Sequence, residues 1–270
     1  MKLLAISDLH LGFSTNRRAL DDLVGTGDDW LILAGDLGET EAHLRAAFDT
    51  LGPRFRRLIW VPGNHELYCD RRDPTSPRGI DKYQRLIDLC RDYDVLTPED
   101  PYPTWTGEGG PHLLVPLFTL YDYSFRPPDV SRERALEWAA ESGVVSSDEM
   151  LLDPHPFAGR DHWCAERVRY SQARLDEAPA DLPTVLINHY PLRQDLVYIP
   201  RVPRYCLWCG TTQTHDWHQR YRARVVVSGH LHVPRTQVID GVRFEEVSFG
   251  YPRQRPADRS INAYVRQILP

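Results

Sequence analysis

The chain has 270 residues, a formal net charge of -6 and a mean hydropathy of -0.47, with 41% hydrophobic and 26% charged residues. This composition is typical of a soluble globular protein and excludes a disordered or membrane-spanning chain, because no stretch is apolar enough to cross a bilayer. The acidic balance argues against a nucleic-acid partner, since nonspecific nucleic-acid binding depends on an excess of basic residues.

The N-terminus and the cysteines predict a cytoplasmic protein. The apolar run in MKLLAISDLH is interrupted by Asp8 before it reaches the length of a signal-peptide core. Five cysteines, an odd number in a chain of this size, are not typical of a disulfide framework. We therefore expect a reducing compartment.

Short runs rich in Leu, Ile and Val alternate with helical patterns, which is typical of a layered α/β fold. Helical spacing predicts covering helices, and a hairpin is expected at 236–251, with Asp240 and Gly241 at its turn. The predicted buried strands are 3–7, 30–34, 57–61, 184–188 and 225–228, and the predicted helices between them are 17–24, 39–51 and 80–93. One more strand, with a proline kink or at an edge position, is expected at 112–123.

Two longer stretches interrupt this rhythm within what we expect to be a single domain spanning residues 1–270. Residues 124–180 contain predicted helices at 131–142 and 161–176, and we interpret the stretch as a cap-like insertion over the site. Residues 190–222 are rich in proline, aromatic residues and arginine, and we expect them to form an irregular loop on the substrate side.

Polar clusters follow the predicted strands at the points where the strands end. Since open α/β sheets bind their ligands at the carboxyl ends of the strands, we expect these clusters to meet at one edge. The clusters are Asp8-Leu9-His10, Gly35-Asp36, Gly63-Asn64-His65-Glu66, Asn188-His189 and Gly229-His230-Leu231-His232.

The residue types in these clusters predict a metal centre. In an extended segment, residues i and i+2 point to the same side, so Asp8 with His10 can aim two ligands at one space. Glycines next to the ligands allow a close approach to an ion. The mixed nitrogen and oxygen set suits Zn, Fe, Mn or Ni, and it has too many members for one ion.

The order of the motifs, D-x-H, G-D, G-N-H-E, H and G-H-x-H, resembles the signature of the calcineurin-like metallophosphoesterase superfamily between residues 8 and 232. The resemblance implies a two-sheet β-sandwich flanked by helices, in a four-layer α/β arrangement, and two divalent cations as cofactors. It implies that one cation is bound by Asp8, His10, Asp36 and His232, and the other by Asp36, Asn64, His189 and His230, with Asp36 as the bridge.

The same resemblance assigns the hydrolytic roles. His65 and Asp36 would be the catalytic residues: His65 contacts the phosphate and protonates the leaving oxygen, with Glu66 as an orienting neighbour. A hydroxide that bridges the two cations would attack phosphorus in line. Asn188 departs from the family, many members of which have glycine there, but His189 still follows a predicted strand.

We expect the substrate to be a small-molecule phosphomonoester, and the motifs leave other hypotheses open. A phosphodiesterase acting on cyclic nucleotides or nucleic acid would use the same ligands, although a nuclease should carry a long basic groove. A protein phosphatase would need an open, shallow site, which the insertion argues against. A catalytically inactive binding scaffold is the last alternative, and metal analysis would distinguish it.

Arg201, Arg204 and Trp208 are candidate substrate residues in the loop at 190–222. Arginine can bind phosphate through two hydrogen bonds and tryptophan can stack on a base or sugar, although an exposed solubilising loop explains the same composition equally well. Cys206 and Cys209 form a C-x-x-C pair, which favours ordinary structural cysteines over a zinc site because no second pair follows at suitable spacing.

Overall fold

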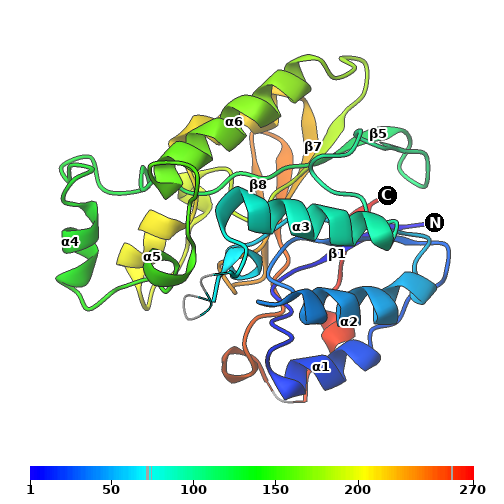
Figure 1. The fold of residues 1–270 in the computed structure, drawn as a ribbon. Coiled ribbons are helices and arrows are strands. Elements are labelled where there is room, and N and C mark those ends of the chain that lie inside the picture. Colours follow the sequence, from blue (N-terminus) through cyan, green and yellow to red (C-terminus); the bar gives the residue numbers. More distant parts are fainter. Residues whose placement is uncertain (71–72, 74, 257) are drawn as a thin grey trace.

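Two β-sheets pack face to face at the centre of the protein, and helices cover their outer sides (Figure 1). The computed structural model describes residues 1–70, 73, 75–256 and 258–270. Among these residues, no helix is both long enough and apolar enough to cross a membrane. The two-sheet sandwich flanked by helices that the sequence predicted is confirmed.

The first sheet has four strands in the order β10-β1-β2-β3. Strands β1, β2 and β3 are parallel, whereas β10 pairs antiparallel with β1 and brings the C-terminus beside the N-terminus (Figure 1). Because parallel strands end at a common edge, the residues that follow β1, β2 and β3 lie together. The bounds are β1 (Leu3–Ile6), β2 (Trp30–Leu33), β3 (Arg57–Trp60) and β10 (Arg266–Leu269).

The second sheet has six strands in the order β4-β5-β6-β7-β9-β8. The four central strands are parallel, and β4 and β8 pair antiparallel at the two edges. The bounds are β4 (Thr104–Trp105), β5 (His112–Pro116), β6 (Thr184–Ile187), β7 (Ala223–Ser228), β8 (Arg235–Ile239) and β9 (Val242–Glu246).

Helices α1, α2 and α3 cover the first sheet, α6 lies over the second sheet, and α4 and α5 lie at the far end of the molecule (Figure 1). Short 3-10 turns occupy several loops, among them η2 (His65–Leu67) and η4 (Pro203–Trp208). The helix bounds are α1 (Ser14–Asp21), α2 (Glu41–Leu51), α3 (Gly79–Asp92), α4 (Ala135–Ala140), α5 (Asp148–Leu151), α6 (Arg160–Asp176) and α7 (Trp217–Arg220).

The alternation of side chains along the strands divides the core into two layers. In β2, Leu31 and Leu33 belong to the same hydrophobic cluster as Phe48 of α2, whereas Ile32 points to the other face and belongs to a second cluster with Val185 of β6. All of these side chains are almost fully buried, and each contributes about 1.5 to 3 kcal/mol relative to an exposed position. The two layers fix the strand ends that carry the polar clusters.

The strand and helix predictions agree with the structure in most places and differ in a few. The strand predicted at 112–123 is shorter and ends at Pro116, after which the Leu117 N–H makes one more bond to the Ile187 carbonyl at 2.7 Å. The helix predicted at 131–142 is shorter, Ala135–Ala140. The sequence did not predict the short elements β4, α5 and β10, because none has a periodic pattern long enough to recognise.

Candidate metal centre

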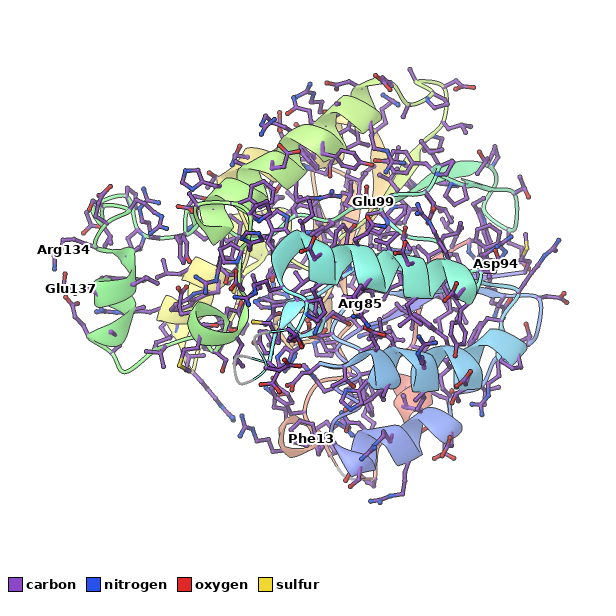
Figure 2. The ribbon with its side chains drawn as sticks, viewed as in Figure 1. Phe13, Arg85, Asp94, Glu99, Arg134 and Glu137 are labelled. Atoms are coloured by element: carbon purple, nitrogen blue, oxygen red, sulfur yellow. The ribbon has the colours of Figure 1, made fainter. Side chains whose placement is uncertain are left out.

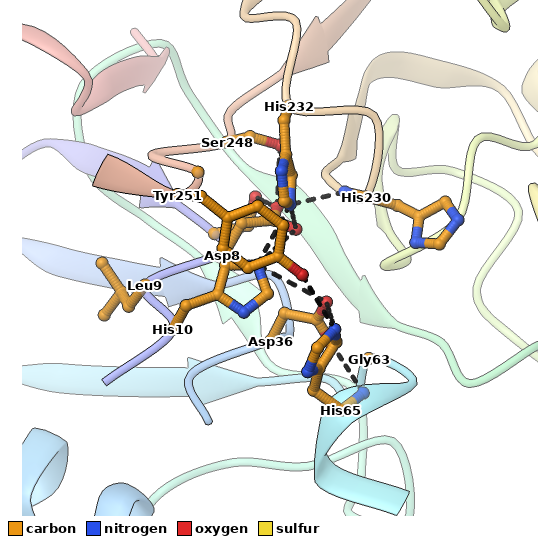
Figure 3. Close-up of polar contacts among 12 residues, drawn as sticks. Asp8, Leu9, His10, Asp36, Gly63, His65, His230, His232, Ser248 and Tyr251 are labelled. Carbon is orange, nitrogen blue, oxygen red and sulfur yellow. Dashed lines mark hydrogen bonds and ion pairs between the residues drawn. The ribbon is translucent and has the colours of Figure 1, made fainter. Parts of the chain in front are cut away.

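The predicted metal ligands other than Asn64 fall into groups of neighbouring side chains at the edge where the parallel strands end, and Figure 3 shows Asp8, His10, Asp36, His230 and His232 among them. They come from the loops after β1, β2, β3, β6 and β7, and a bridge between Ser7 and Ser248 joins the two sheets at this point. Two groups of predicted ligands have all their ligand atoms within 4.8 Å of one another, namely Asp8, His10 and His232, and Asp36, His189 and His230.

Five of the predicted ligands have left-handed backbone conformations. The φ angles are 56° at Asp8, 43° at His10, 55° at Asp36, 71° at His230 and 54° at His232. The expectation that Asp8 and His10 share a side because their segment is extended was therefore wrong. Sharp turns aim these side chains instead, at a cost of about 1 to 2 kcal/mol for each residue.

Two glycines permit the close approach of these loops. A Cβ atom at Gly63 would lie 2.1 Å from Oδ1 of Asp36, and one at Gly35 would lie 2.5 Å from Nδ1 of His189. Gly35 also has a φ of 89°, which other residues adopt with strain. At both positions glycine makes room for a ligand side chain from another loop, whereas its effect on the approach to an ion stays a prediction.

The first candidate metal position lies between Asp8, His10 and His232. Nε2 of His232 lies 2.9 Å from Oδ1 of Asp8 and 3.0 Å from Nε2 of His10. In the neutral His232 ring, Nδ1 donates to Oε1 of Gln254 at 2.7 Å, which leaves the lone pair of Nε2 facing the other two ligands. These three side chains therefore surround one small space with nitrogen and carboxylate ligands.

The second carboxylate oxygen of Asp8, Oδ2, is fixed by hydrogen bonds from other residues. Oδ2 accepts hydrogen bonds from the hydroxyls of Ser7 at 2.5 Å and Ser248 at 2.8 Å, and from the His230 N–H at 3.0 Å. These three donors fix the carboxylate plane and leave Oδ1 for a ligand. The residues that fix it were not predicted, because serine beside a motif has no distinctive spacing.

The second candidate metal position lies between Asp36, His189 and His230, and Asn64 is the fourth ligand that the family resemblance implies there. Nε2 of His189 lies 3.5 Å from Oδ2 of Asp36, and its Nδ1 is hydrogen-bonded to the Ala34 carbonyl at 2.8 Å. This bond sets the tautomer of His189 and turns the lone pair of Nε2 toward Asp36.

Unpaired polar atoms support metal binding at this second position. Within the described residues, Oδ1 of Asn64, Nε2 of His189 and Nε2 of His230 are buried and have no hydrogen-bond partner. A buried polar atom without a partner costs about 1 to 3 kcal/mol, and a cation would satisfy all three. The side chains present therefore fit a metal ion, and two divalent cations would supply an activated water and positive charge for the phosphate oxygens.

The local electrostatics prepare the ligands for cations. Burial opposes ionisation of Asp8 and Asp36, but the surrounding histidines outweigh it and lower the pKa of both carboxyls. Burial lowers the pKa of His10 and of His230 to about 3, so both imidazoles are neutral and keep a lone pair. Ionised carboxylates beside neutral imidazoles are the ligand forms that bind divalent metals.

His65 lies beside the metal ligands, with Nε2 3.9 Å from Oδ2 of Asp36 (Figure 3). Its Nδ1 is 3.1 Å from Oε1 of Glu39, and its Nε2 is 3.3 Å from the hydroxyl of Tyr251. Burial would lower the pKa of His65, but Asp36 and Glu39 raise it to about 9. The ring is therefore a proton donor at neutral pH, as a leaving-group acid must be.

Glu39 and Tyr251 are neighbours of His65 that sequence reasoning missed. Glu39 follows the G-D motif and could have been noticed there, whereas Tyr251 lies in a loop after β9 with no motif to mark it. Glu66 contacts other groups instead: it accepts hydrogen bonds from the N–H groups of Asp36, Leu37 and Gly63. Its orienting effect thus acts on two ligand loops, not on the His65 ring.

A cavity of about 570 Å³ opens beside His10 and His65. Phe13, which is 48% exposed, and Tyr251, whose ring stacks on His10 at 4.3 Å, form an aromatic side of this cavity (Figures 2 and 3). None of its lining residues comes from 124–180 or 190–222, two stretches that the structure describes in full. The lining residues are His10, Gly12, Phe13, Gly38, Glu39, His65, Tyr251, Pro252 and Arg253.

The predicted substrate residues lie elsewhere. Trp208 is buried and donates its indole N–H to Glu149 at 2.8 Å, and Arg204 forms an ion pair with Glu141 at 2.9 Å. Both contacts join the loop at 190–222 to the segment 124–180. Arg201 is exposed, and a substrate role for these three residues stays a prediction.

Cys206 lies in η4 and Cys209 directly follows it, and both are free thiols. Sγ of Cys209 is hydrogen-bonded to the Tyr205 carbonyl at 3.4 Å. In the part of the chain that the structure describes, neither cysteine belongs to a group of three or more potential metal ligands.

Comparison with known proteins agrees with this geometry. The chain is 48% identical over 270 residues to the [Acyl-carrier-protein] phosphodiesterase PptH of Mycobacterium tuberculosis, covering 99% of this chain and 83% of that protein. The crystal structure of Phosphopantetheinyl Hydrolase (PptH) from the same organism superposes with a TM-score of 0.95 at 48% identity, covering 100% of this chain and 96% of that one.

A structure from Thermus thermophilus, TT1561, is similar in fold alone, with a TM-score of 0.50 at 14% identity over 91% of this chain and 88% of that one. The family model for calcineurin-like phosphoesterase matches residues 1–234, which include all the predicted metal ligands. Together with the relative from Mycobacterium tuberculosis, this match shows that the chain belongs to the calcineurin-like phosphoesterases and is a metal-dependent hydrolase of phosphoric esters.

Proposed function

We propose that this protein hydrolyses the phosphodiester that joins phosphopantetheine to an acyl carrier protein. The observation that carries the proposal is the 48% identity, over the whole chain, to a phosphodiesterase named for acyl carrier protein. At this identity over 270 residues, together with a TM-score of 0.95, the loops around the site are expected to serve a similar substrate.

The cavity beside His65 supports a substrate of this shape. Phosphopantetheine is a narrow, largely uncharged arm with a phosphate at one end, so its site needs a phosphate-binding end and a long weakly polar wall. Phe13, Tyr251 and Pro252 offer such a wall, and Arg253 offers a positive charge. Since Phe13 is 48% exposed, the cavity is open to an arm that remains attached to a protein.

We assign the roles of the side chains accordingly. The two groups described above, which include Asp36, would hold two divalent cations, and these would supply an activated water and positive charge for the phosphate oxygens. His65 gives its proton to the serine oxygen of the carrier as the P–O bond breaks. Addition of one water across that bond yields a carrier with a free serine and phosphopantetheine ending in a phosphomonoester.

The sequence-based preference for a small-molecule phosphomonoester stays a prediction, and the relative's name favours the diester instead. A purified holo acyl carrier protein incubated with the Mn²⁺-loaded enzyme tests the choice by intact mass spectrometry. We expect the carrier to lose the whole phosphopantetheinyl group, while Asp36→Asn leaves it intact. A carrier that stays unchanged, or one that keeps the phosphate on serine, would contradict the proposal.

Chromogenic esters separate the bond types without a protein substrate. We expect faster hydrolysis of bis-p-nitrophenyl phosphate than of p-nitrophenyl phosphate, with Mn, Fe, Zn and Ni each added to the metal-free enzyme. The reverse order, together with inactivity on the carrier, would restore the phosphomonoester hypothesis.

A pair of variants tests which surface meets the substrate. Arg253→Ala should raise KM for the carrier more than it lowers kcat, because Arg253 lines the cavity and touches no predicted metal ligand. Arg204→Ala should leave KM unchanged, because Arg204 is engaged with Glu141 and with the Trp138 carbonyl. A KM effect for Arg204→Ala alone would return the substrate site to the loop at 190–222.

A further inference from the structure

Two side chains outside the sequence motifs hold the amide group of Asn64. Nδ2 of Asn64 donates to Oδ1 of Asp148 at 2.9 Å and to the hydroxyl of Tyr68 at 3.1 Å. The Tyr68 hydroxyl in turn donates to the same oxygen of Asp148 at 2.6 Å. The three groups form a closed hydrogen-bonded triangle, and Asp148 lies 84 residues from Asn64 in the sequence.

This triangle determines which way the amide faces. A carboxylate can only accept hydrogen bonds, so the NH₂ of Asn64 must face Asp148 and the amide oxygen must face away. That oxygen is buried and has no partner within the described residues, like Nε2 of His189 and of His230. The orientation set by Asp148 therefore leaves the oxygen of Asn64 unpaired and available for the ligand role that the family resemblance implies.

Asp148 is itself fixed by its surroundings. It is fully buried, and it begins α5 in the segment 124–180. Arg160 donates to the Asp148 carbonyl at 2.7 Å and forms an ion pair with Glu149 at 2.9 Å, while Trp208 donates to Glu149 at 2.8 Å. These contacts hold the backbone of the short helix, and Tyr68 and Asn64 hold the carboxylate through Oδ1, while Oδ2 has no partner within the described residues.

We propose that Asp148 is a positioning residue of the metal centre, which orients Asn64 as a neutral ligand and strengthens it by drawing on the amide N–H. Without the carboxylate, the Asn64 amide can rotate and turn its NH₂ group toward the cation. The partial positive charge of the NH₂ group and the cation then repel each other. The segment 124–180 is then part of the metal-binding machinery rather than only a cover. The inference rests on the proposed metal positions but not on the proposed substrate.

The test measures metal binding directly. Metal-free Asp148→Ala, titrated with Mn²⁺ in a calorimeter, should lose about 10- to 100-fold in affinity at one of two sites. The site formed by Asp8, His10 and His232 should keep the parental affinity. Electron paramagnetic resonance distinguishes a coupled Mn²⁺ pair from single ions. For Asp148→Ala with one equivalent of Mn²⁺, we expect the signal of single ions instead of the signal of a coupled pair.

Two controls separate positioning from general damage. Asp153→Ala removes a carboxylate from the same segment, where Asp153 accepts from the His155 N–H and pairs with Arg78, and it should bind both ions normally. Asn64→Ala combined with Asp148→Ala should bind no more weakly than Asn64→Ala alone, because Asp148 acts only through Asn64. Additive losses, or equal losses at both sites, would overturn the proposal.

If Asp148→Ala does not fold, Asp148→Asn replaces it in the same metal titration. It keeps the shape and one oxygen but loses the charge, so second-site affinity should still fall, by less than for alanine. Parental affinity at both sites in Asp148→Asn would overturn the inference. Because no ester is used, these results are independent of whether holo acyl carrier protein is a substrate.

Discussion

Replacing Glu66 by glutamine should destabilise the protein far more than an ordinary loss of one charge. The carboxylate is fully buried, and it joins two loops that carry metal ligands. Oε2 accepts from the N–H groups of Asp36 at 3.0 Å and Gly63 at 2.9 Å, and Oε1 accepts from the Leu37 N–H at 2.6 Å. Glutamine offers only one oxygen for these three donors.

The size of the effect follows from these bonds. The best placement puts the amide oxygen of glutamine where Oε2 lies, which keeps two bonds and turns an NH₂ group toward the Leu37 N–H. The unpaired donor costs about 1 to 3 kcal/mol. The two retained bonds weaken with the charge, but its loss also removes the burial penalty that raises the pKa of Glu66, and the two effects oppose each other. We expect Glu66→Gln to lower the free energy of unfolding by about 1 to 3 kcal/mol.

The assay is urea unfolding at pH 8, with and without Mn²⁺. Burial and the charge of Asp36 raise the pKa of Glu66 to about 7, so at pH 8 the parental side chain is ionised. Glu137→Gln is the matched control, because Glu137 is exposed on α4 beside Arg134 (Figure 2) and should change stability by less than about 0.5 kcal/mol. Equal stability of the Glu66 and Glu137 variants would refute the role of the three N–H contacts.

Three further predictions concern the chemistry. His65→Ala should keep two metal equivalents by elemental analysis but lower kcat about 10²- to 10⁴-fold, and an unchanged rate would remove its assigned role. Glu39→Gln should lower the pKa of His65, so the alkaline limb of the pH profile moves to lower pH, though only slightly because Glu39 is 58% exposed; a shift to higher pH would contradict this. Despite burial, Asp36 raises the pKa of His189 and Asp8 raises the pKa of His232. Metal binding should therefore release protons from these rings, and the metal affinity should increase as the pH rises. Identical calorimetric heats of metal binding in buffers of different ionisation enthalpy would contradict this.

The parts of the site that could be predicted are those that depend on strand ends. Apolar runs such as 30–34 predict parallel strands, and the residues that follow such a strand lie at the common edge of the sheet. Asp36 is an example, because it comes shortly after the run 30–34. The types of the ligands and their convergence therefore follow from the sequence without knowledge of the turns. The left-handed conformations of Asp8 and His10 could not be predicted, because only the packed loops select them.

The residues that were missed belong to segments with no repeating pattern. Asp148 stands in a polar stretch, VSSDEM, where nothing distinguishes it from an exposed aspartate, and it is nevertheless fully buried. Tyr251 follows β9 and reaches His65 across 186 residues of sequence. Such contacts depend on how loops fold over the sheet edge, which local propensity does not determine.

The division between strand ends and loops also explains why reaction class is easier to infer than substrate. Backbone bonds to neighbouring loops, His10 N–H to the Asp36 carbonyl at 3.0 Å and Gly250 N–H to the Asp8 carbonyl at 3.0 Å, hold strained ligands in place, so the sheets themselves define the centre. Phe13 and Arg253, in contrast, line the cavity and belong to none of the candidate metal groups. Substitutions there can change which ester is bound without disturbing the cations, so the same motifs can serve monoesters, diesters and protein-borne groups.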